Sequence, residues 1–137
     1  MEDLETRKEV YGICGECNEP GTGRKWCQPC NAKRFKDNFK NWTSGNKDID
    51  ELIQQSQLNA VHYTKCLEWI PFENLQGITS SNYRFEYREI HSADWAEGYI
   101  EQWDIENKTW KRFSNTKVAL KSLKDDFYMT EFLNEVN

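Results

Sequence analysis

The chain has 137 residues, a formal net charge of −5 and a mean hydropathy of −0.93. Its length suits one ordinary domain or two small ones, and its acidic balance argues against nucleic acid or an anionic membrane as the main partner. It has neither an apolar run long enough to span a bilayer nor a signal peptide at its acidic start, so we expect a cytoplasmic or nuclear protein with reduced thiols.

Four cysteines dominate the first part of the chain. Residues 1–10 are charged and are expected to form a disordered tail. The next segment, 11–45, holds two CxxC pairs separated by nine residues, at Cys14, Cys17, Cys27 and Cys30. Two residues between cysteines let a tight turn direct both sulfurs to one point, and two such knuckles complete a tetrahedral Zn–S₄ site. We therefore predict a structural zinc ion with no open position for a substrate.

Other uses of these cysteines remain as alternatives. Disulfides suit a secreted chain, and a redox CxxC normally stands alone at a helix start, whereas an iron–sulfur cluster would use the same ligands. Cys66 is distant from the four and is expected to be an idle thiol. Basic residues follow the knuckles at Lys33, Arg34, Lys36 and Lys40. They leave nucleic-acid binding open as an alternative, although a negative tetrathiolate site would also attract them.

Two helices are predicted next. Aromatic residues at a helical spacing indicate a helix from Asn31 to Trp42. A helical linker over 46–68 follows, with Asp48 as its N-cap. Pro71 then ends the helical pattern and favours an extended Ile70.

The rest of the chain is predicted to consist mainly of strands. Apolar and charged residues alternate from Tyr83 to Tyr87. Three strong strands follow, at Tyr99–Trp103, Lys108–Phe113 and Val118–Leu123. We expect a turn at residues 106–107, an unpaired sheet edge after Leu123, and the start of a helix at Met129. The predicted fold class is α+β, with a zinc knuckle and helices before an incomplete antiparallel sheet.

Two short motifs in this half resemble protein kinases. Residues 118–121 (VALK) resemble the V-A-I-K strand, and residues 131–136 (EFLNEV) resemble the opening of the αC helix. With the CGxC…WCxxC segment ahead of them, the chain resembles a large fungal family of tyrosine-kinase-like proteins. The resemblance implies that 69–137 is a partial kinase N-lobe, in which Lys121 and Glu135 are remnants of a site for ATP and Mg²⁺. It also implies kinase-like or signalling proteins as partners.

The chain departs from the kinase pattern in two ways. Residues 78–97 contain no glycine, where the family has a Gly-rich loop, and Glu86 and Glu89 would bring negative charge towards a triphosphate. The catalytic loop and the DFG motif are absent from the sequence. We therefore expect a truncated kinase-like protein that binds ATP poorly and is inactive, although ATP binding and protein phosphorylation are the family's function. The alternative is a zinc-knuckle module that binds protein or nucleic acid.

Overall fold

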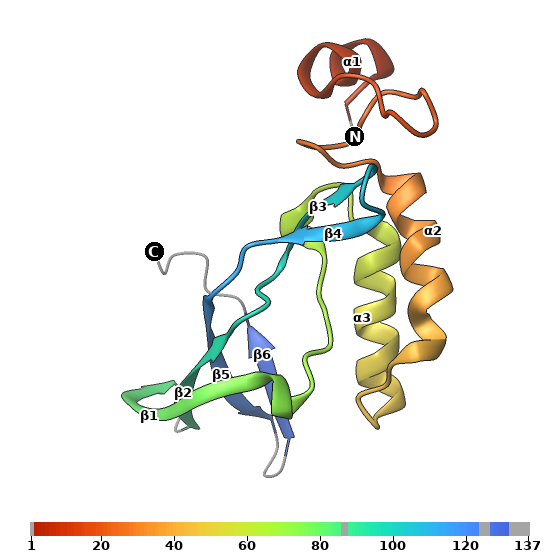
Figure 1. The fold of residues 1–137 in the computed structure, drawn as a ribbon. Coiled ribbons are helices and arrows are strands. Elements are labelled where there is room, and N and C mark those ends of the chain that lie inside the picture. Colours follow the sequence, from red (N-terminus) through yellow and green to blue (C-terminus); the bar gives the residue numbers. More distant parts are fainter. Residues whose placement is uncertain (1, 86–87, 124–126, 132–137) are drawn as a thin grey trace. The chain divides into compact units, whose positions relative to one another are not determined.

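A computed structural model of the chain describes residues 2–85, 88–123 and 127–131, with side chains outside 79–90 and 121–131. The α-helices in these residues are α1 (Leu4–Tyr11), α2 (Gln28–Asn38) and α3 (Lys47–Asn59). The strands are β1 (Leu75–Phe85), β2 (Arg88–Trp95), β3 (Ile100–Asp104), β4 (Thr109–Arg112), β5 (Thr116–Leu123) and β6 (Phe127–Glu131) (Figure 1). Short 3₁₀ helices lie at Phe39–Asn41, Tyr63–Lys65 and Phe72–Asn74. No described helix is both long and apolar enough to cross a bilayer.

The chain forms two compact units, and both are discontinuous in sequence. The knuckle unit consists of Met1–Trp69 and Ile100–Lys111, and the sheet unit consists of Ile70–Tyr99 and Arg112–Asn137. The chain therefore passes from the knuckle unit to the sheet unit, returns for the β3–β4 hairpin, and leaves again. The kinase resemblance predicts this hairpin as part of the sheet, within 69–137.

Helix α1 lies where a disordered tail was expected. Asp3 caps it by accepting a hydrogen bond from the Thr6 backbone N–H at 2.8 Å. The Arg7 guanidinium then donates to the carbonyl oxygens of Gly21 and Pro20, at 3.0 and 2.8 Å. No residue of this helix is buried. The contacts that hold this helix come from another segment of the chain. The spacing of apolar residues therefore could not have predicted it.

Helices α2 and α3 confirm the predicted helical pair, and Figure 1 shows them side by side and antiparallel. The α2 pattern ends as a 3₁₀ turn over Phe39–Asn41. The cap of α3 differs from the prediction, since Asn46 rather than Asp48 accepts from the first free backbone N–H groups. Asparagine and aspartate are both good caps, so residue type alone did not separate these two positions.

The β3–β4 hairpin completes the core of the knuckle unit. The buried residues of this core are Trp26, Phe35, Ala60 and Ile100, with Phe39, Tyr63, Cys66 and Trp110 packed against them. The Trp110 ring stacks on Phe35, with ring centroids 4.9 Å apart, and on Trp26, at 5.9 Å. The predicted turn is confirmed between Asp104 and Thr109, where Lys108 has a φ of 53°. The hairpin thus covers the aromatic core of this unit with the Trp110 ring.

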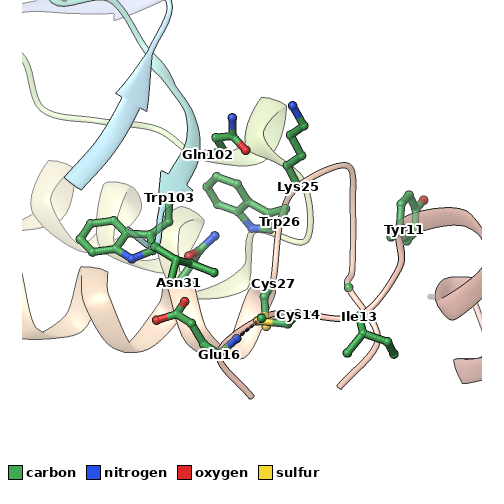
Figure 2. A pocket seen from close by; sticks show the side chains of 13 residues that line it. Tyr11, Ile13, Cys14, Glu16, Lys25, Trp26, Cys27, Asn31, Gln102 and Trp103 are labelled. Atoms are coloured by element: carbon green, nitrogen blue, oxygen red, sulfur yellow. Dashed lines mark hydrogen bonds between the residues drawn. The ribbon is translucent and has the colours of Figure 1, made fainter. Parts of the chain in front are cut away.

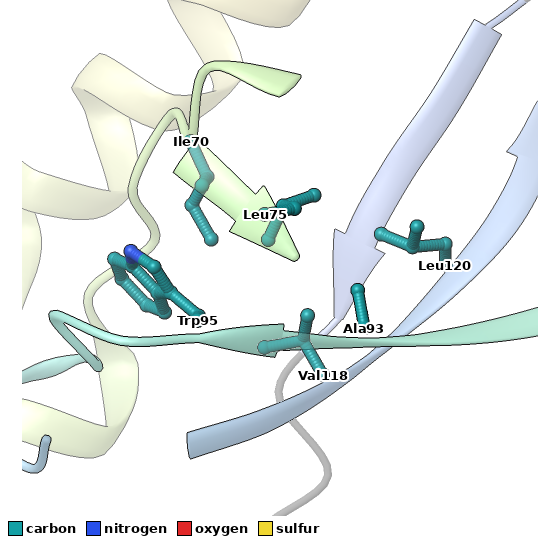
Figure 3. Close-up of a cluster of buried hydrophobic side chains, with 6 residues drawn as sticks. All are labelled: Ile70, Leu75, Ala93, Trp95, Val118 and Leu120. Carbon is teal, nitrogen blue, oxygen red and sulfur yellow. The ribbon is translucent and has the colours of Figure 1, made fainter. Parts of the chain in front are cut away.

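The sheet unit is built on a four-stranded antiparallel sheet in the order β1-β2-β5-β6. Its core consists of Ile70, Leu75, Ala93, Trp95, Val118 and Leu120 (Figure 3). Two sequence predictions are wrong here. Strand β5 is an inner strand because β6 pairs along it, so the sheet edge lies at β6 and not at the strand that ends at Leu123. Met129–Glu131 belongs to β6 and not to a helix, since its backbone pairs with Ala119–Lys121.

Candidate metal centre

The first knuckle is a tight turn held by its own backbone. The Cys14 N–H donates to the Glu19 carbonyl at 2.8 Å, and the Asn18 N–H donates to the Cys14 carbonyl at 2.9 Å. Asn18 has a φ of 63°, a left-handed conformation that asparagine tolerates. The Glu16 N–H points at the Cys14 sulfur, 3.4 Å away. This turn brings the Cys14 and Cys17 sulfurs to one side.

The second knuckle leads directly into α2. A turn from Gly23 to Trp26 closes through reciprocal backbone hydrogen bonds of 3.1 and 3.4 Å. Cys27 is then the N-cap residue of α2, and Cys30 lies in its first turn. The free N–H groups and the positive end of the helix dipole lie at this point, and they act to lower the thiol pKa values against the effect of burial.

Both knuckles direct their sulfurs to a common point. The Sγ atoms of Cys14, Cys17, Cys27 and Cys30 all lie within 4.8 Å of one another. Across the knuckles, Cys14 and Cys30 are 4.0 Å apart and Cys17 and Cys27 are 3.7 Å apart. A tetrahedral site with Zn–S bonds of about 2.3 Å places its sulfurs about 3.8 Å apart. The predicted ligand set is therefore close enough to hold a metal ion, and its geometry is consistent with structural zinc.

As free thiols the four cysteines differ in acidity. Burial raises the pKa of Cys27 far above its usual value and raises the pKa of Cys30 to about 11. For Cys14, burial also acts to raise the pKa, but N–H groups of Cys17 and Glu16 outweigh it and lower the pKa. Metal ligands are thiolates, so binding must displace protons and becomes weaker as the pH falls.

The second knuckle is tied to the end of α3. The Trp26 indole N–H donates to the Ala60 carbonyl at 2.9 Å, and the Thr22 hydroxyl donates to the Val61 carbonyl at 2.9 Å. An added Cβ at Gly23 would lie 2.6 Å from the same Val61 oxygen, so only glycine fits this approach. Gln28 adds a hydrogen bond of 2.7 Å to the Leu58 carbonyl.

An ion pair joins the first knuckle to α2 and to the hairpin. Arg34 pairs with the Glu16 carboxylate and donates to the Asn31 side-chain oxygen at 2.6 Å. Its guanidinium also lies over the Trp103 ring, 4.3 Å from the centroid. Arg34 is one of the four basic residues that leave nucleic-acid binding open, and its charge is paired within the knuckle unit.

A pocket of about 270 Å³ adjoins the cysteines within the knuckle unit (Figure 2). Its walls include Cys14, Cys27, Trp26, Asn31, Gln102 and Trp103. No sequence pattern predicts this pocket, because its walls come from segments far apart in the chain.

The remaining predicted site residues, Lys121 and Glu135, do not form a described site. The Lys121 main chain lies in β5, opposite Ile90 and Met129, but its side chain is outside the described part. Glu135 also lies outside the described residues. The fifth cysteine, Cys66, packs against the core of the knuckle unit, apart from the metal centre.

The chain matches no protein-family model, no curated protein and no solved structure. The resemblance to tyrosine-kinase-like proteins therefore stays a prediction drawn from the residues themselves. Any statement about function has to rest on the chemistry of the described side chains.

Proposed function

We propose that the knuckle unit is a zinc-stabilised recognition module that binds a partner protein. The proposal rests on the convergence of four cysteine sulfurs within 4.8 Å of one another. Four thiolates fill the coordination shell of a tetrahedral zinc ion, so the metal would join chain segments and not activate water. A unit built in this way is suited to presenting a fixed surface.

Metal analysis tests the first part of this proposal. We expect the purified chain to bind a single zinc ion, and cobalt substitution to give the visible spectrum of a tetrahedral tetrathiolate site. A chelator should unfold the knuckle unit, because metal-binding energy is also folding energy in small zinc modules. Iron with inorganic sulfide in place of zinc, or no bound metal, would overturn the proposal.

A pair of cysteine variants makes that test specific. Cys27→Ser removes a ligand at the start of α2 and should abolish stoichiometric binding. Cys66→Ser changes a half-buried thiol that lies apart from the cluster, so it should retain the metal. Equal metal loss in both variants would show general unfolding and not ligand removal.

Nucleic-acid binding is a second candidate because α2 carries an exposed basic stripe. Lys33, Lys36 and Lys40 are exposed and, at spacings of three and four, lie on one side of the helical segment. Binding of a labelled single-stranded RNA and a DNA duplex should then weaken steeply with salt. Replacing the three lysines by glutamine should reduce that slope. The candidate fails if neither probe shows salt-dependent binding.

For the sheet unit we propose a kinase-derived scaffold that does not transfer phosphate. The VALK residues 118–121 lie in an inner strand, which is compatible with the resemblance. The absence of glycine from residues 78–97 argues against close backbone contact with a triphosphate. A nucleotide-binding measurement, given in the Discussion, tests this part.

A further inference from the structure

The pocket beside the metal centre has walls from three parts of the knuckle unit. Cys14 and Cys27, two of the four candidate ligands, line it, as do Gln102 and Trp103 of β3. Its volume of about 270 Å³ is slightly below the usual range for pockets that enclose a drug-sized molecule. It is large enough for one bulky side chain together with its peptide group.

Asn31 provides a hydrogen-bond donor on the pocket wall. The residue is only 3% exposed, and its side-chain oxygen accepts from Arg34 at 2.6 Å. Because Arg34 can only donate, this contact fixes which end of the amide is oxygen. The amide nitrogen donates to no acceptor within the described part of the chain. The nitrogen is not a buried unsatisfied atom, so it is open to the pocket, where an oxygen atom of a ligand can accept its hydrogen bond.

The charges around the pocket nearly cancel. The Glu16 carboxylate is neutralised by Arg34, and Lys25 is exposed with no ion pair among the described residues. A zinc ion with four thiolates carries a formal charge of about −2. The single lysine therefore does not make this a phosphate site. An uncharged oxygen, such as a peptide carbonyl, suits the Asn31 donor better.

Two exposed aliphatic side chains line the pocket. They are Ile13 and Ile105, and each is 47% exposed. Trp26 is buried, and Arg34 covers the Trp103 ring, so neither ring offers the open stacking surface that a nucleobase needs. Exposed isoleucines at the mouth of a pocket instead favour an apolar side chain. The lack of an open aromatic ring and the presence of exposed isoleucines both favour a peptide over a nucleic acid as the ligand.

We infer that this pocket binds a large apolar side chain of a partner protein, with the adjacent main-chain carbonyl accepting a hydrogen bond from Asn31. Gln102 of β3 is half-buried and supplies a second amide to the same peptide. This inference rests on the proposed function and names the kind of segment that the module recognises.

The test begins with selection of a phage-displayed random peptide library on the zinc-loaded full chain. The enriched peptides should share one large aliphatic or aromatic residue and no fixed charge. Their affinity, measured by calorimetry with the synthetic peptides, should change little with salt. Enrichment of charged peptides with steep salt dependence would overturn the inference, as would the absence of any enriched peptide.

Variants then locate the binding site. Asn31→Asp keeps the oxygen that accepts from Arg34 but removes the donor, so peptide affinity should fall about tenfold. Ile105→Ala should weaken binding several-fold, whereas Leu52→Ala, a similarly exposed aliphatic residue outside the pocket, should leave it unchanged. Equal affinity in all three variants would place the peptide elsewhere and overturn the inference.

Zinc content separates the two proposals. If Asn31→Asp loses its metal, Ile105→Ala still tests the pocket, because its side chain is exposed. A zinc-loaded chain whose selected peptides ignore the pocket variants would overturn only the pocket inference. A chain that binds no zinc would overturn the proposed function itself.

Discussion

The Asp50 carboxylate closes the turn that precedes α3. It accepts hydrogen bonds from the Thr43 hydroxyl at 2.5 Å and from the Ser44 hydroxyl and N–H at 2.6 and 2.8 Å. Partial burial acts to raise the pKa of Asp50, but these hydrogen bonds from Ser44 and Thr43 outweigh it and lower the pKa. The folded protein thus favours the ionised carboxylate.

This shift predicts a pH-dependent effect of Asp50→Asn. A lowered pKa in the folded state stabilises the protein above the usual aspartate pKa, and that stability is lost as the pH falls through the folded-state value. The variant should unfold at lower urea than wild type at neutral pH, and the gap should narrow below about pH 4. Asp48→Asn removes the same charge from the same helix without those hydrogen bonds. Equal losses in both variants would contradict the role of the hydrogen bonds.

Gly98 is a second position where one residue determines local structure. It has a φ of 73°, and an added Cβ would lie 1.6 Å from the Phe113 carbonyl oxygen. The Arg112 guanidinium also donates to the Gly98 carbonyl at 2.8 Å. The backbone can pass Phe113 at this distance only without a side chain.

We therefore expect Gly98→Ala to destabilise the sheet unit by about 3 kcal/mol or more, because strain adds to a backbone clash. Urea unfolding followed by circular dichroism would measure the change. Gly77→Ala is the matched control in the same unit: its φ is also positive, at 59°, but a Cβ there meets only the Asp94 carboxylate. A loss in Gly98→Ala no larger than in this control would contradict the clash.

Among the elements, the β3–β4 hairpin is the one that sequence patterns assigned to the wrong unit. Its strands and turn follow from alternation and turn residues, which are local signals. Its packing on Phe35 and Trp26 is non-local, and a tryptophan such as Trp110 packs equally well on a sheet or on a helix. The sequence therefore predicted the element but not its neighbours.

The Trp110 contacts predict a large effect of Trp110→Ala on the knuckle unit. Removing a half-buried ring that stacks on two others should lower its stability by about 2–3 kcal/mol, measured by urea unfolding of the zinc-loaded protein. Trp42→Ala provides a control, because among the described aromatic rings this half-buried ring contacts Phe39 alone, edge-on at 6.2 Å. Equal destabilisation by the two changes would argue against the hairpin as a structural part of this unit.

The candidate site was predictable where its signal was local. Two residues between cysteines fix the distance between their sulfurs, so the ligand set followed from spacing alone. Asn31, Arg34 and Trp103 carry no such signal, since their roles depend on a turn, a helix and a hairpin meeting. The same reason explains α1, whose Arg7 side chain is held by the Pro20 and Gly21 carbonyls in another segment.

At the scale of the whole chain, the kinase resemblance yields a nucleotide-binding prediction. With no glycine in residues 78–97, we expect calorimetry with Mg-ATP to show no micromolar binding. Lys121→Met should then give the same trace as wild type. Micromolar binding that is lost in Lys121→Met would contradict this prediction and support a working nucleotide site.

The two discontinuous units also change how the chain divides into domains. A boundary near residue 69, which the kinase resemblance implies, separates the knuckles from Ile100 and Trp110. A fragment that ends there would expose the faces of Trp26 and Phe35 that the hairpin covers. The hairpin therefore belongs in any fragment meant to contain the knuckle unit.

The returning hairpin has a consequence for synthesis on the ribosome. The knuckles and both long helices emerge first, but the ring that completes their core, Trp110, is translated only after the first two strands of the sheet unit. Domains generally fold as their chains are made, and exposed apolar surface invites aggregation in the interval. Early metal capture by the cysteines would hold the nascent segment in a near-native form until the hairpin arrives.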